Sequence, residues 1–509
     1  MSRSVRILVS IPLLLAGGFL LSLQGCGGSG STTISTGGGS PKVEHVVIIF
    51  QENRTPDNLF QGLCIAPYGS PSACAVNAGP SQYEIQTSNW SNNQASGGVT
   101  QPGVIDLGTY GSNPDNYDLS HAHSAFNDMC DLSASGTCQM DGAALVPYSC
   151  TAGQVNCPPP ANPQYMYVNP ADVQPYLTMA QRYTFADHMF QTNQGPSFPA
   201  HQFIISGTSA PSATSNLFAS ENPLASGAAG TAGCIGPPGE TVTLIDPTGS
   251  ETSNAPIYPC FEHPTLTDSL DAASITWRYY APSAGSIWTA PNAIQHMCGP
   301  NNPPPNGTAC VGADWTGASP KVVINQTQTT AQILSDITGS SLQNVSWVIP
   351  DGDDSDHARS NDGCGPYWVT SIVDAIGASQ YWSNTVIILA WDDWGGWYDH
   401  VPPPQVLAGS NCAQFGCGYI YGFRVPMVVI SPYAKLGYIS KANHDFGSIL
   451  KFIEGNFSLP SLGYADADAD DLSDIFDYSQ TPTTFANIPL PTTPSYCPTD
   501  KAASDPDDD

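Results

Sequence analysis

Two pairs of neighbouring oxygen-bearing side chains in this sequence could bind a metal ion. Glu52-Asn53 and Asp392-Asp393 each stand just after a short apolar run. Two adjacent carboxylates at the end of a buried strand repel each other, and a cation between them relieves that repulsion. Carboxylate and amide oxygens suit a hard or borderline divalent ion. An isolated Asp-Asp pair is more often a solvated turn, but the two pairs together favour a metal site.

These side chains need a sheet to bring them together, and the apolar runs predict one. The runs are bounded by turn or polar residues, as expected for buried parallel strands. They cover residues 46–50, 345–349, 385–391 and 425–431, with 274–280 as a fifth candidate. Helix-like stretches lie at 172–183, 264–273, 329–338, 367–379 and 446–457. This alternation predicts an α/β three-layer sandwich with a mostly parallel central sheet.

Ligands of such sheets bind beyond the carboxyl ends of the strands. Three of the predicted strands are followed there by acidic or metal-binding residue types, including the acidic stretch that ends at His357. The two glycines after Asp393 are expected to let the backbone approach a ligand closely. Residues 61–160 and 207–260 look like long insertions over the edge of the sheet.

The N-terminus resembles an export signal. Arg3 and Arg6 precede an apolar stretch, residues 7–23, which is short for a membrane span and ends in small residues. We predict a signal peptide at 1–25 and lipidation of Cys26, whose preceding residues resemble a bacterial lipobox. The alternative is an ordinary secretory signal with an incidental cysteine. The chain is then expected to be an exported lipoprotein of the bacterial cell envelope (periplasm or outer membrane) or a secreted protein.

The rest of the chain divides into three predicted parts. Residues 26–41 are rich in Gly, Ser and Thr, which suits a flexible tether. Residues 42–495 contain no clear linker or repeat and are predicted to form one large domain. Residues 496–509 are predicted to be an acidic tail.

The cysteine content also favours export. Of 15 cysteines, 14 remain when Cys26 is set aside, and an oxidising compartment would allow up to seven disulfides. A zinc site is a weak alternative because no two C-x-x-C units occur. Short separations suggest the pairs Cys64 and Cys74, Cys130 and Cys138, Cys150 and Cys157, Cys298 and Cys310, and Cys412 and Cys417.

The charge balance argues against several classes of partner. Lys and Arg number 13 against 43 Asp and Glu, for a formal charge of −30. Such a surface repels nucleic acid and anionic lipid, so we expect no nucleic-acid partner and membrane contact only through the lipid anchor. Because few ion pairs exist to be broken, the composition suggests tolerance of acid, and an acidic habitat is a hypothesis.

Several segments resemble the bacterial and fungal phosphoesterase family, in the order in which that family has them. This family includes non-haemolytic phospholipases C and a group of acid phosphatases, and its fold is related to that of alkaline phosphatases and sulfatases. The matching segments are residues 45–62, 194–208, 346–357, 385–404, 421–440 and 445–457, which together span most of the mature chain.

The resemblance implies a role for each metal-binding candidate. Glu52 and Asn53 match the first ligand pair of the family, and Asp392 and Asp393 match the last. Ser197 matches the nucleophile, which also contacts the metal. A metal-bound hydroxyl has a lowered pKa and can attack phosphorus at mild pH. One divalent ion is expected, and the oxygen-rich set does not discriminate between calcium, manganese, iron and zinc.

Histidines of the motifs are implied to contact the substrate. His357 and His121 match active-site histidines of the family, with His123 as a competitor of His121, and His296 lies at about the spacing of another. Their expected role is to hydrogen-bond phosphoryl oxygens and to protonate the leaving alkoxide. His400 is assigned a supporting role behind the ligands, with a structural hydrogen bond under the loop as the alternative.

One motif departs from the family. Relatives often read Pro-Asn-Arg where this chain reads Pro199-Ala200-His201. If that Asn or Arg helps to bind phosphate, its part is lost or moved to His201, which is therefore a supporting candidate. Arg54 and Arg424 are read as supporting the fold and not as catalytic.

These observations favour an acid phosphatase that acts through a phosphoseryl intermediate on Ser197. The alternative within the same class is a phospholipase C that cleaves phospholipid head groups. The end of the chain soon after the last motif and the lack of a twin-arginine signal favour the phosphatase. The expected substrate is a small phosphoester or a phospholipid. An alternative of another class is a surface-anchored binding module without catalysis.

Overall fold

A computed structural model describes most of the chain from residue 42 onward. The described ranges are 42–93, 97–107, 117–150, 157–224, 231–252, 256–324, 329–358, 363–406, 419–490 and residue 497. They belong to one compact unit that runs from Ser40 to Asp509. The predicted signal peptide, Cys26, the tether and most of the acidic tail lie outside the described residues.

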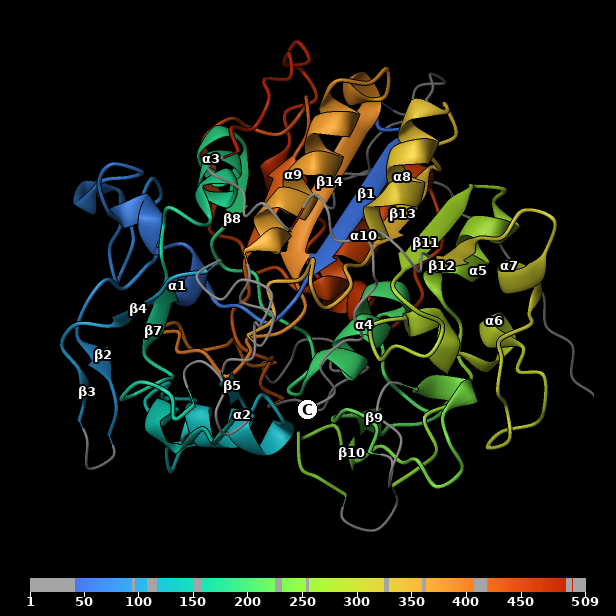
Figure 1. The fold of residues 1–509 in the computed structure, drawn as a ribbon, viewed down its shortest axis with the longest axis horizontal. Helices are drawn as coiled ribbons and strands as arrows, with labels where there is room; N and C mark the ends of the chain where they lie inside the picture. The colour runs from blue at the N-terminus through green and yellow to red at the C-terminus, as the bar shows by residue number, and fades with distance from the viewer. Residues whose placement is uncertain are drawn as a thin grey trace, which may run out of the picture. The chain divides into compact units, whose positions relative to one another are not determined.

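The centre of this unit is a mixed sheet of eight strands (Figure 1). Its order is β12 (Val322–Ile324), β11 (Trp277–Ala281), β13 (Val345–Val348), β1 (His45–Gln51), β14 (Thr385–Trp391), β15 (Met427–Ile430), β8 (Thr184–Ala186) and β16 (Tyr438–Ser440). Every residue of β1, β13 and β14 is buried. Both faces of these strands are therefore covered, which explains why they are continuous apolar runs.

The five predicted strands all belong to this sheet, but the direction of one was wrong. Strand β15 runs antiparallel to both of its neighbours, β14 and β8, whereas the other neighbouring strands are parallel. A parallel neighbour requires a crossover, usually a helix. The described residues between β14 and β15 contain no helix, so the chain re-enters the sheet from the edge at which it left. Strands β8, β12 and β16 were missed because three residues carry no periodic signal.

Helices cover the two faces and complete the predicted sandwich. In Figure 1, α3 (Gln174–Arg182), α8 (Thr329–Thr338) and α9 (Cys364–Gly377) lie on the near side of the sheet, and α10 (Phe446–Phe457) lies behind it. Helix α10 packs against α4 (Ser197–Ser206), which in turn packs against α5 (Leu266–Ala272). The sequence predicted all of these helices except α4. Among the described residues, none of the helices has the length and apolar character required to cross a bilayer.

Small two-stranded sheets form in and beside the predicted insertions, and four disulfides bridge residues within those insertions. These sheets pair β2 (Trp90–Ser91) with β3 (Gly98–Val99), β4 (Gly103–Ile105) with β7 (Met166–Val168), β5 (Asp118–Leu119) with β6 (Tyr148–Ser149), and β9 (Phe218–Ala219) with β10 (Leu244–Ile245). Four predicted disulfides are confirmed: Cys64–Cys74, Cys130–Cys138, Cys150–Cys157 and Cys298–Cys310. Two further bridges are Cys234–Cys260 and Cys364–Cys497. The pair Cys412 and Cys417 lies outside the described residues.

Candidate functional site

Strands β11, β13, β1 and β14 are neighbours and run parallel, so their carboxyl ends share one edge of the sheet. Glu52-Asn53 follows β1 at this edge, and Asp392-Asp393 follows β14. The backbone N–H of Asn53 donates to Oδ1 of Asp392 over 2.9 Å. The structure thus brings together the two pairs that the sequence separates by more than 300 residues.

Ser197 is the first residue of α4 and lies against both pairs. Its Oγ is 3.1 Å from Oδ2 of Asp393, 3.4 Å from Oε2 of Glu52 and 3.5 Å from Oδ1 of Asn53. The sequence did contain signals for this unpredicted helix. Pro199 suits its first turn, and Gly207 follows its last residue with a left-handed φ of 71°.

The three carboxylates of the cluster are fully buried, which is unfavourable for three neighbouring negative charges. Burial, and then the charge of Asp392, holds the pKa of Glu52 well above its usual range. Burial and the same neighbour also raise the pKa of Asp393. Oδ2 of Asp392 has no hydrogen-bond partner. An oxygen-rich, electron-rich and incompletely satisfied cluster of this kind fits a divalent cation.

His201 is closer to the cluster than the sequence suggested. Its Nε2 is 3.1 Å from Oε1 of Glu52 and 4.0 Å from Oδ2 of Asp392. Ligand atoms of these three residues all lie within 4.8 Å of one another, as in a metal site. Burial lowers the pKa of His201 to about 4. The imidazole is therefore neutral, and a neutral imidazole is the form that can ligate a metal.

Asn53 connects the carboxylates to two histidines. Its backbone φ is 59°, a left-handed conformation that asparagine tolerates better than most residues. With Nδ2 facing Glu52 and Asp392, at 3.3 and 3.1 Å, its Oδ1 accepts from Nε2 of His121 and His357 at 3.1 and 2.9 Å. In the opposite orientation Oδ1 faces Ser197, as a metal ligand would. A cation would favour the second orientation because it attracts the amide oxygen.

His121, and not its competitor His123, faces the cluster. Nε2 of His121 is 3.9 Å from Oδ2 of Asp393, and its ring centroid is 5.8 Å from that of His357. The ring of His123 instead hydrogen-bonds the backbone oxygen of Gln194 at 3.2 Å. Both remaining candidates for substrate contact, His121 and His357, are thus gathered around Asn53.

His296 is not brought to this cluster. It lies on the short helix α6 (Gln295–Cys298), and both of its ring nitrogens face carboxylates. Nδ1 is 2.9 Å from Glu262, and Nε2 is 3.3 Å from Asp268. The similar spacing in sequence was misleading, because α6 turns this side chain toward a partly exposed acidic pair.

His400 lies in a buried polar network behind the candidate ligands. Its Nδ1 is 2.6 Å from Oδ2 of Asp57, and Asp57 follows the loop of Glu52-Asn53. The guanidinium of Arg424 donates to Asp399 over 2.9 to 3.2 Å. The backbone N–H of Asp57 also donates to Asp399 over 3.3 Å. The network therefore ties the segment after β1 to the segment after β14, as expected for groups that support the fold.

The two glycines after Asp393 bring protein segments together and do not make room for a ligand. A Cβ on Gly395 would lie 2.4 Å from the backbone oxygen of Asn53. A Cβ on Gly396 would lie 2.4 Å from the Cβ of Leu119, two residues before His121. Both glycines have positive φ, at 60° and 72°. Their role is close approach between the loops that form the site.

Two residues near the cluster have no counterpart in the sequence predictions. The indole ring of Trp288 lies 6.2 Å from the imidazole of His357, measured between centroids. Oε1 of Glu221 accepts a hydrogen bond from the backbone N–H of His123 over 3.0 Å, and burial raises the pKa of Glu221 to about 7. Neither residue belongs to a recognisable motif, although Trp288 does follow a predicted strand.

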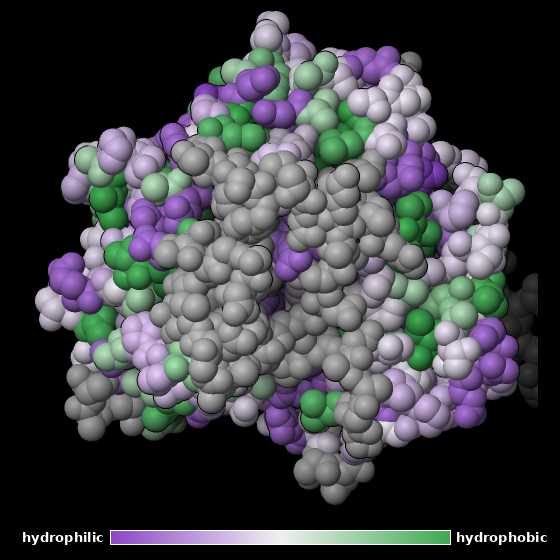
Figure 2. Space-filling model, viewed as in Figure 1, coloured by the Kyte–Doolittle hydropathy of each residue, from purple (hydrophilic) through white to green (hydrophobic). Residues whose placement is uncertain are grey.

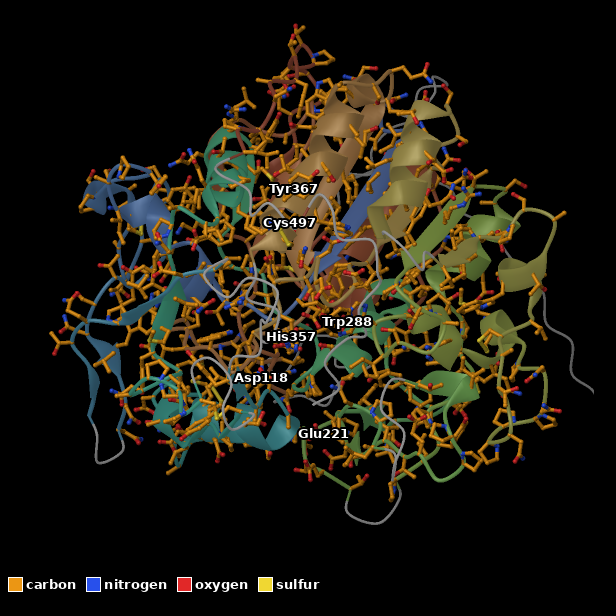
Figure 3. All side chains as sticks on the ribbon, in the orientation of Figure 1. Asp118, Glu221, Trp288, His357, Tyr367 and Cys497 are labelled. Atoms are coloured by element: carbon orange, nitrogen blue, oxygen red, sulfur yellow. A yellow bond between two sulfur atoms is a disulfide. The ribbon has the colours of Figure 1, made fainter. Side chains whose placement is uncertain are left out.

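The site lies near the middle of the face shown in the figures. Figure 2 shows hydrophilic residues near the middle of this face. In the same orientation, Figure 3 shows the side chains of Trp288 and His357 next to each other, with Asp118 and Glu221 below them. These residues come from separate segments of the chain that meet at the carboxyl edge of the sheet.

Comparison with known proteins gives a family. The sequence profile of the Phosphoesterase family matches residues 43–460. The chain is 23% identical over 470 residues to a hemolytic phospholipase C of Pseudomonas aeruginosa, covering 86% of this chain and 56% of that protein. It is 25% identical over 321 residues to a non-hemolytic phospholipase C of the same organism, covering 58% of this chain and 40% of that protein.

The solved structure of a Vibrio parahaemolyticus protein in the alkaline phosphatase superfamily aligns with the chain at a TM-score of 0.30 and 10% identity, covering 58% of this chain and 63% of that one.

The chain spans about half the length of the two phospholipases. The family profile covers most of the chain itself, including all strands of the central sheet. By this match the chain belongs to the phosphoesterase family.

Proposed function

We propose that this chain is a metal-dependent acid phosphatase in which Ser197 is the nucleophile. The observation that carries the proposal is the position of the Ser197 hydroxyl, whose Oγ lies 3.1 to 3.5 Å from oxygens of Asp393, Glu52 and Asn53. A serine hydroxyl has one proton to donate, whereas a divalent cation can bind several of these oxygens at once.

The proposed metal ligands are the side chains around this hydroxyl. They are Glu52, Asn53, Asp392, Asp393 and Ser197, and the position of His201 makes it a further candidate. A divalent ion bound by this set would lower the pKa of the serine hydroxyl and balance the charge of the phosphoryl oxygens.

The chain's own groups account for the two steps of the reaction. In the first step, the hydroxyl of Ser197 gives its proton to Asp393, Oγ forms a bond to phosphorus, and the bond to the leaving alkoxide breaks. His121 or His357 gives the alkoxide a proton. In the second step, water gives a proton to that histidine and attacks the phosphoserine, the bond between Oγ and phosphorus breaks, Oγ takes its proton back from Asp393, and phosphate leaves. Protonated histidines would also bring positive charge to a chain poor in lysine and arginine, which supports an acidic optimum.

A Ser197→Ala variant tests this mechanism. We expect it to lose at least ~1,000-fold in kcat on p-nitrophenyl phosphate, on the order of the effect of removing a nucleophile. Ser206→Ala is the matched control, because Ser206 is a buried serine at the other end of α4 and is expected to leave kcat unchanged. Phosphatase activity retained in Ser197→Ala would reject the assigned nucleophile.

A phospholipase C is the second candidate, and the names of the two relatives support it. Parallel assays with p-nitrophenyl phosphate and phosphatidylcholine vesicles separate the two candidates. We expect turnover of the monoester, and lipid cleavage without monoester turnover would reject the phosphatase assignment. If neither substrate is cleaved by the metal-loaded protein, the binding module without catalysis becomes the better description.

Export and lipidation of Cys26 belong to the proposal as well. Six disulfides between described cysteines are compatible with an oxidising compartment. Labelling of cells with an alkyne fatty acid is expected to mark the wild-type chain and not a Cys26→Ser variant. Equal labelling of both chains would contradict the anchor.

A further inference from the structure

We propose that the indole N–H of Trp288 is a hydrogen-bond donor to the phosphoester group of the substrate. This inference rests on the proposed function, because it requires a phosphoryl group bound over the cluster of Ser197, Asn53 and the three carboxylates. It adds a substrate-binding residue that no motif indicated.

The first observation is the position of Trp288 at the functional edge of the sheet. The chain leaves the carboxyl end of β11 at Ala281, and Trp288 lies in the connection that follows. In the sheet, β11 is next to β13, and β13 is next to β1. His357 follows β13 and Glu52 follows β1, so Trp288 continues a row of site residues supplied by adjacent parallel strands.

The second observation is an unpaired donor. Nε1 of Trp288 is buried and has no hydrogen-bond partner, and the whole residue is 0% exposed. A buried indole N–H normally finds an acceptor, because leaving one unpaired is costly. The ring lies beside His357, at 6.2 Å between centroids and a tilt of 34°. A phosphoryl oxygen bound beside His357 would supply the missing acceptor.

The backbone of Trp288 is held firmly, as a substrate-binding residue requires. Its carbonyl oxygen accepts from the hydroxyl of Tyr279 on β11 over 2.8 Å, and its N–H donates to Oγ of Ser286 over 3.0 Å. Tyr279 is itself fully buried. The backbone of Trp288 is thus anchored to the central sheet before any ligand arrives, which reduces the entropic cost of binding.

The other described indoles with a buried, unpaired N–H group lie elsewhere, and one of them, Trp368, is on helix α9. Trp394 packs against Phe423, and the ring of Trp397 lies under the guanidinium of Arg54. Trp315 lies on α7 (Ala313–Thr316), which packs against α6 and β12 at the edge of the sheet. Trp288 is distinguished from these by its contact with an imidazole of the candidate site.

The inference also supplies a donor in place of His296, which the sequence assigned to the site and the structure turns away from it. The sequence placed a phosphate-binding donor at His296, whose ring is instead paired with Glu262 and Asp268. Trp288 comes from the same connection after β11 and supplies an N–H donor that remains uncharged at every pH. The acid limb of the pH profile should therefore contain no contribution from this position.

An isosteric replacement tests the donor without changing the shape of the side chain. We would incorporate β-(3-benzothienyl)alanine at position 288, which replaces the indole N–H by sulfur, and the same residue at position 315 as the matched control. The expected result at 288 is a roughly 10- to 100-fold loss of kcat/KM on p-nitrophenyl phosphate, in the range for one donor to a charged group. The control is expected to stay within about twofold.

A binding measurement separates this inference from the proposed function. Calorimetric titration of the metal-loaded protein with inorganic phosphate should show about tenfold weaker binding for the replacement at 288 and for Trp288→Phe, with the metal content unchanged. If phosphate binds but no ester is hydrolysed, the proposed function fails while the role of Trp288 can still be judged. The inference would be overturned if the variant at 288 had the phosphate affinity and kcat/KM of the wild type. It would also be overturned if the variant at 315 lost as much of both as the variant at 288.

Discussion

Ser197 and the residues around it show how buried charge defines this site. Two carboxylates and an amide surround the Ser197 hydroxyl, His201 and Asp392 lie beside them, and burial raises the pKa of Glu52 and Asp393. In the absence of a cation this arrangement costs stability, because the charged forms lack solvent and repel each other. The same arrangement is a candidate site for a divalent ion. The proposed function and the cost in stability therefore have the same origin at this scale.

Removal of the metal should affect stability as well as activity. We expect dialysis against a chelator to abolish phosphatase activity and to lower Tm by several degrees, since an ion at roughly 100 to 1,000 times its Kd contributes about 3 to 4 kcal/mol. Differential scanning calorimetry before and after re-addition of single metals measures both effects and identifies the ion that restores them. An unchanged Tm and full activity after verified metal removal would contradict a metal site at Glu52 and Asp392.

At the scale of elements, the loops of the site depend on close backbone contacts. Gly195 lies two residues before Ser197, the proposed nucleophile, and a Cβ there would lie 1.8 Å from the backbone oxygen of Ser220. The neighbouring residue Asn222 accepts a hydrogen bond from the N–H of Phe198 over 2.9 Å. The start of α4 is therefore held against this loop, and a displacement of either segment moves Ser197.

A Gly195→Ala variant should lose activity through this displacement. We expect kcat/KM to fall about 100-fold, since a shift of about 1 Å in a reacting group can cost that much. Gly455→Ala is the control, because Gly455 lies in α10 and a Cβ added there would meet only open space. That change should leave activity intact and raise the free energy of unfolding by about 0.5 to 1 kcal/mol. Steady-state kinetics and urea unfolding of both variants check the pair.

The buried network behind the ligands should be essential to stability. Arg424 is 0% exposed and lies near three carboxylates, those of Asp399, Asp57 and Asp187. Arg424→Met leaves them without their shared counter-charge and is expected to cost about 3 to 5 kcal/mol. Arg182→Met is the control, since Arg182 donates to exposed backbone oxygens and its replacement should cost less than about 1 kcal/mol. If the Arg424→Met and Arg182→Met variants had equal urea unfolding midpoints, the network would not contribute to stability as proposed.

At the scale of the whole molecule, buried carboxyl groups make stability depend on pH. Burial raises the pKa of Glu454 to about 8, and the carboxylate of Asp466 beside it acts in the same direction, whereas Lys451 opposes it. The ordinary value is 4.5. Because the folded pKa is raised, this contribution is fully present below about pH 4.5 and is lost as the pH rises through 8. The direction agrees with the acid tolerance suggested by the composition.

Glu454→Gln should remove this dependence. Glutamine does not ionise, so the free energy of unfolding of the variant is expected to fall less between pH 5 and 8, by about 2 kcal/mol once solvent screening is allowed for. Urea unfolding at pH 5, 6.5 and 8 measures the difference. Parallel curves for the two proteins would show that Glu454 has an ordinary pKa.

At lower pH the buried His263 limits the gain in stability. Burial lowers the pKa of His263, so its protonation in the folded protein is costly.

The sequence by itself determined five of the eight strands of the sheet, the helices that pack on it except α4, and the two candidate ligand pairs. Continuous apolar runs identify strands buried on both faces, and the residues that follow such strands must meet at one edge. Glu52-Asn53 and Asp392-Asp393 could be found by this rule alone. The motifs around Ser197, His121 and His357 added residues whose positions no periodicity reveals.

Only the tertiary structure decided which of the remaining candidates belong to the site. His296 and His201 were both histidines in motif-like segments, but the helices that carry them turn one toward an acidic surface pair and the other onto Glu52. Trp288 carried no signal, since an unpaired buried N–H exists only after packing is complete. Spacing along the chain constrains which loop a residue occupies, whereas the direction of its side chain is set by the contacts of the folded core.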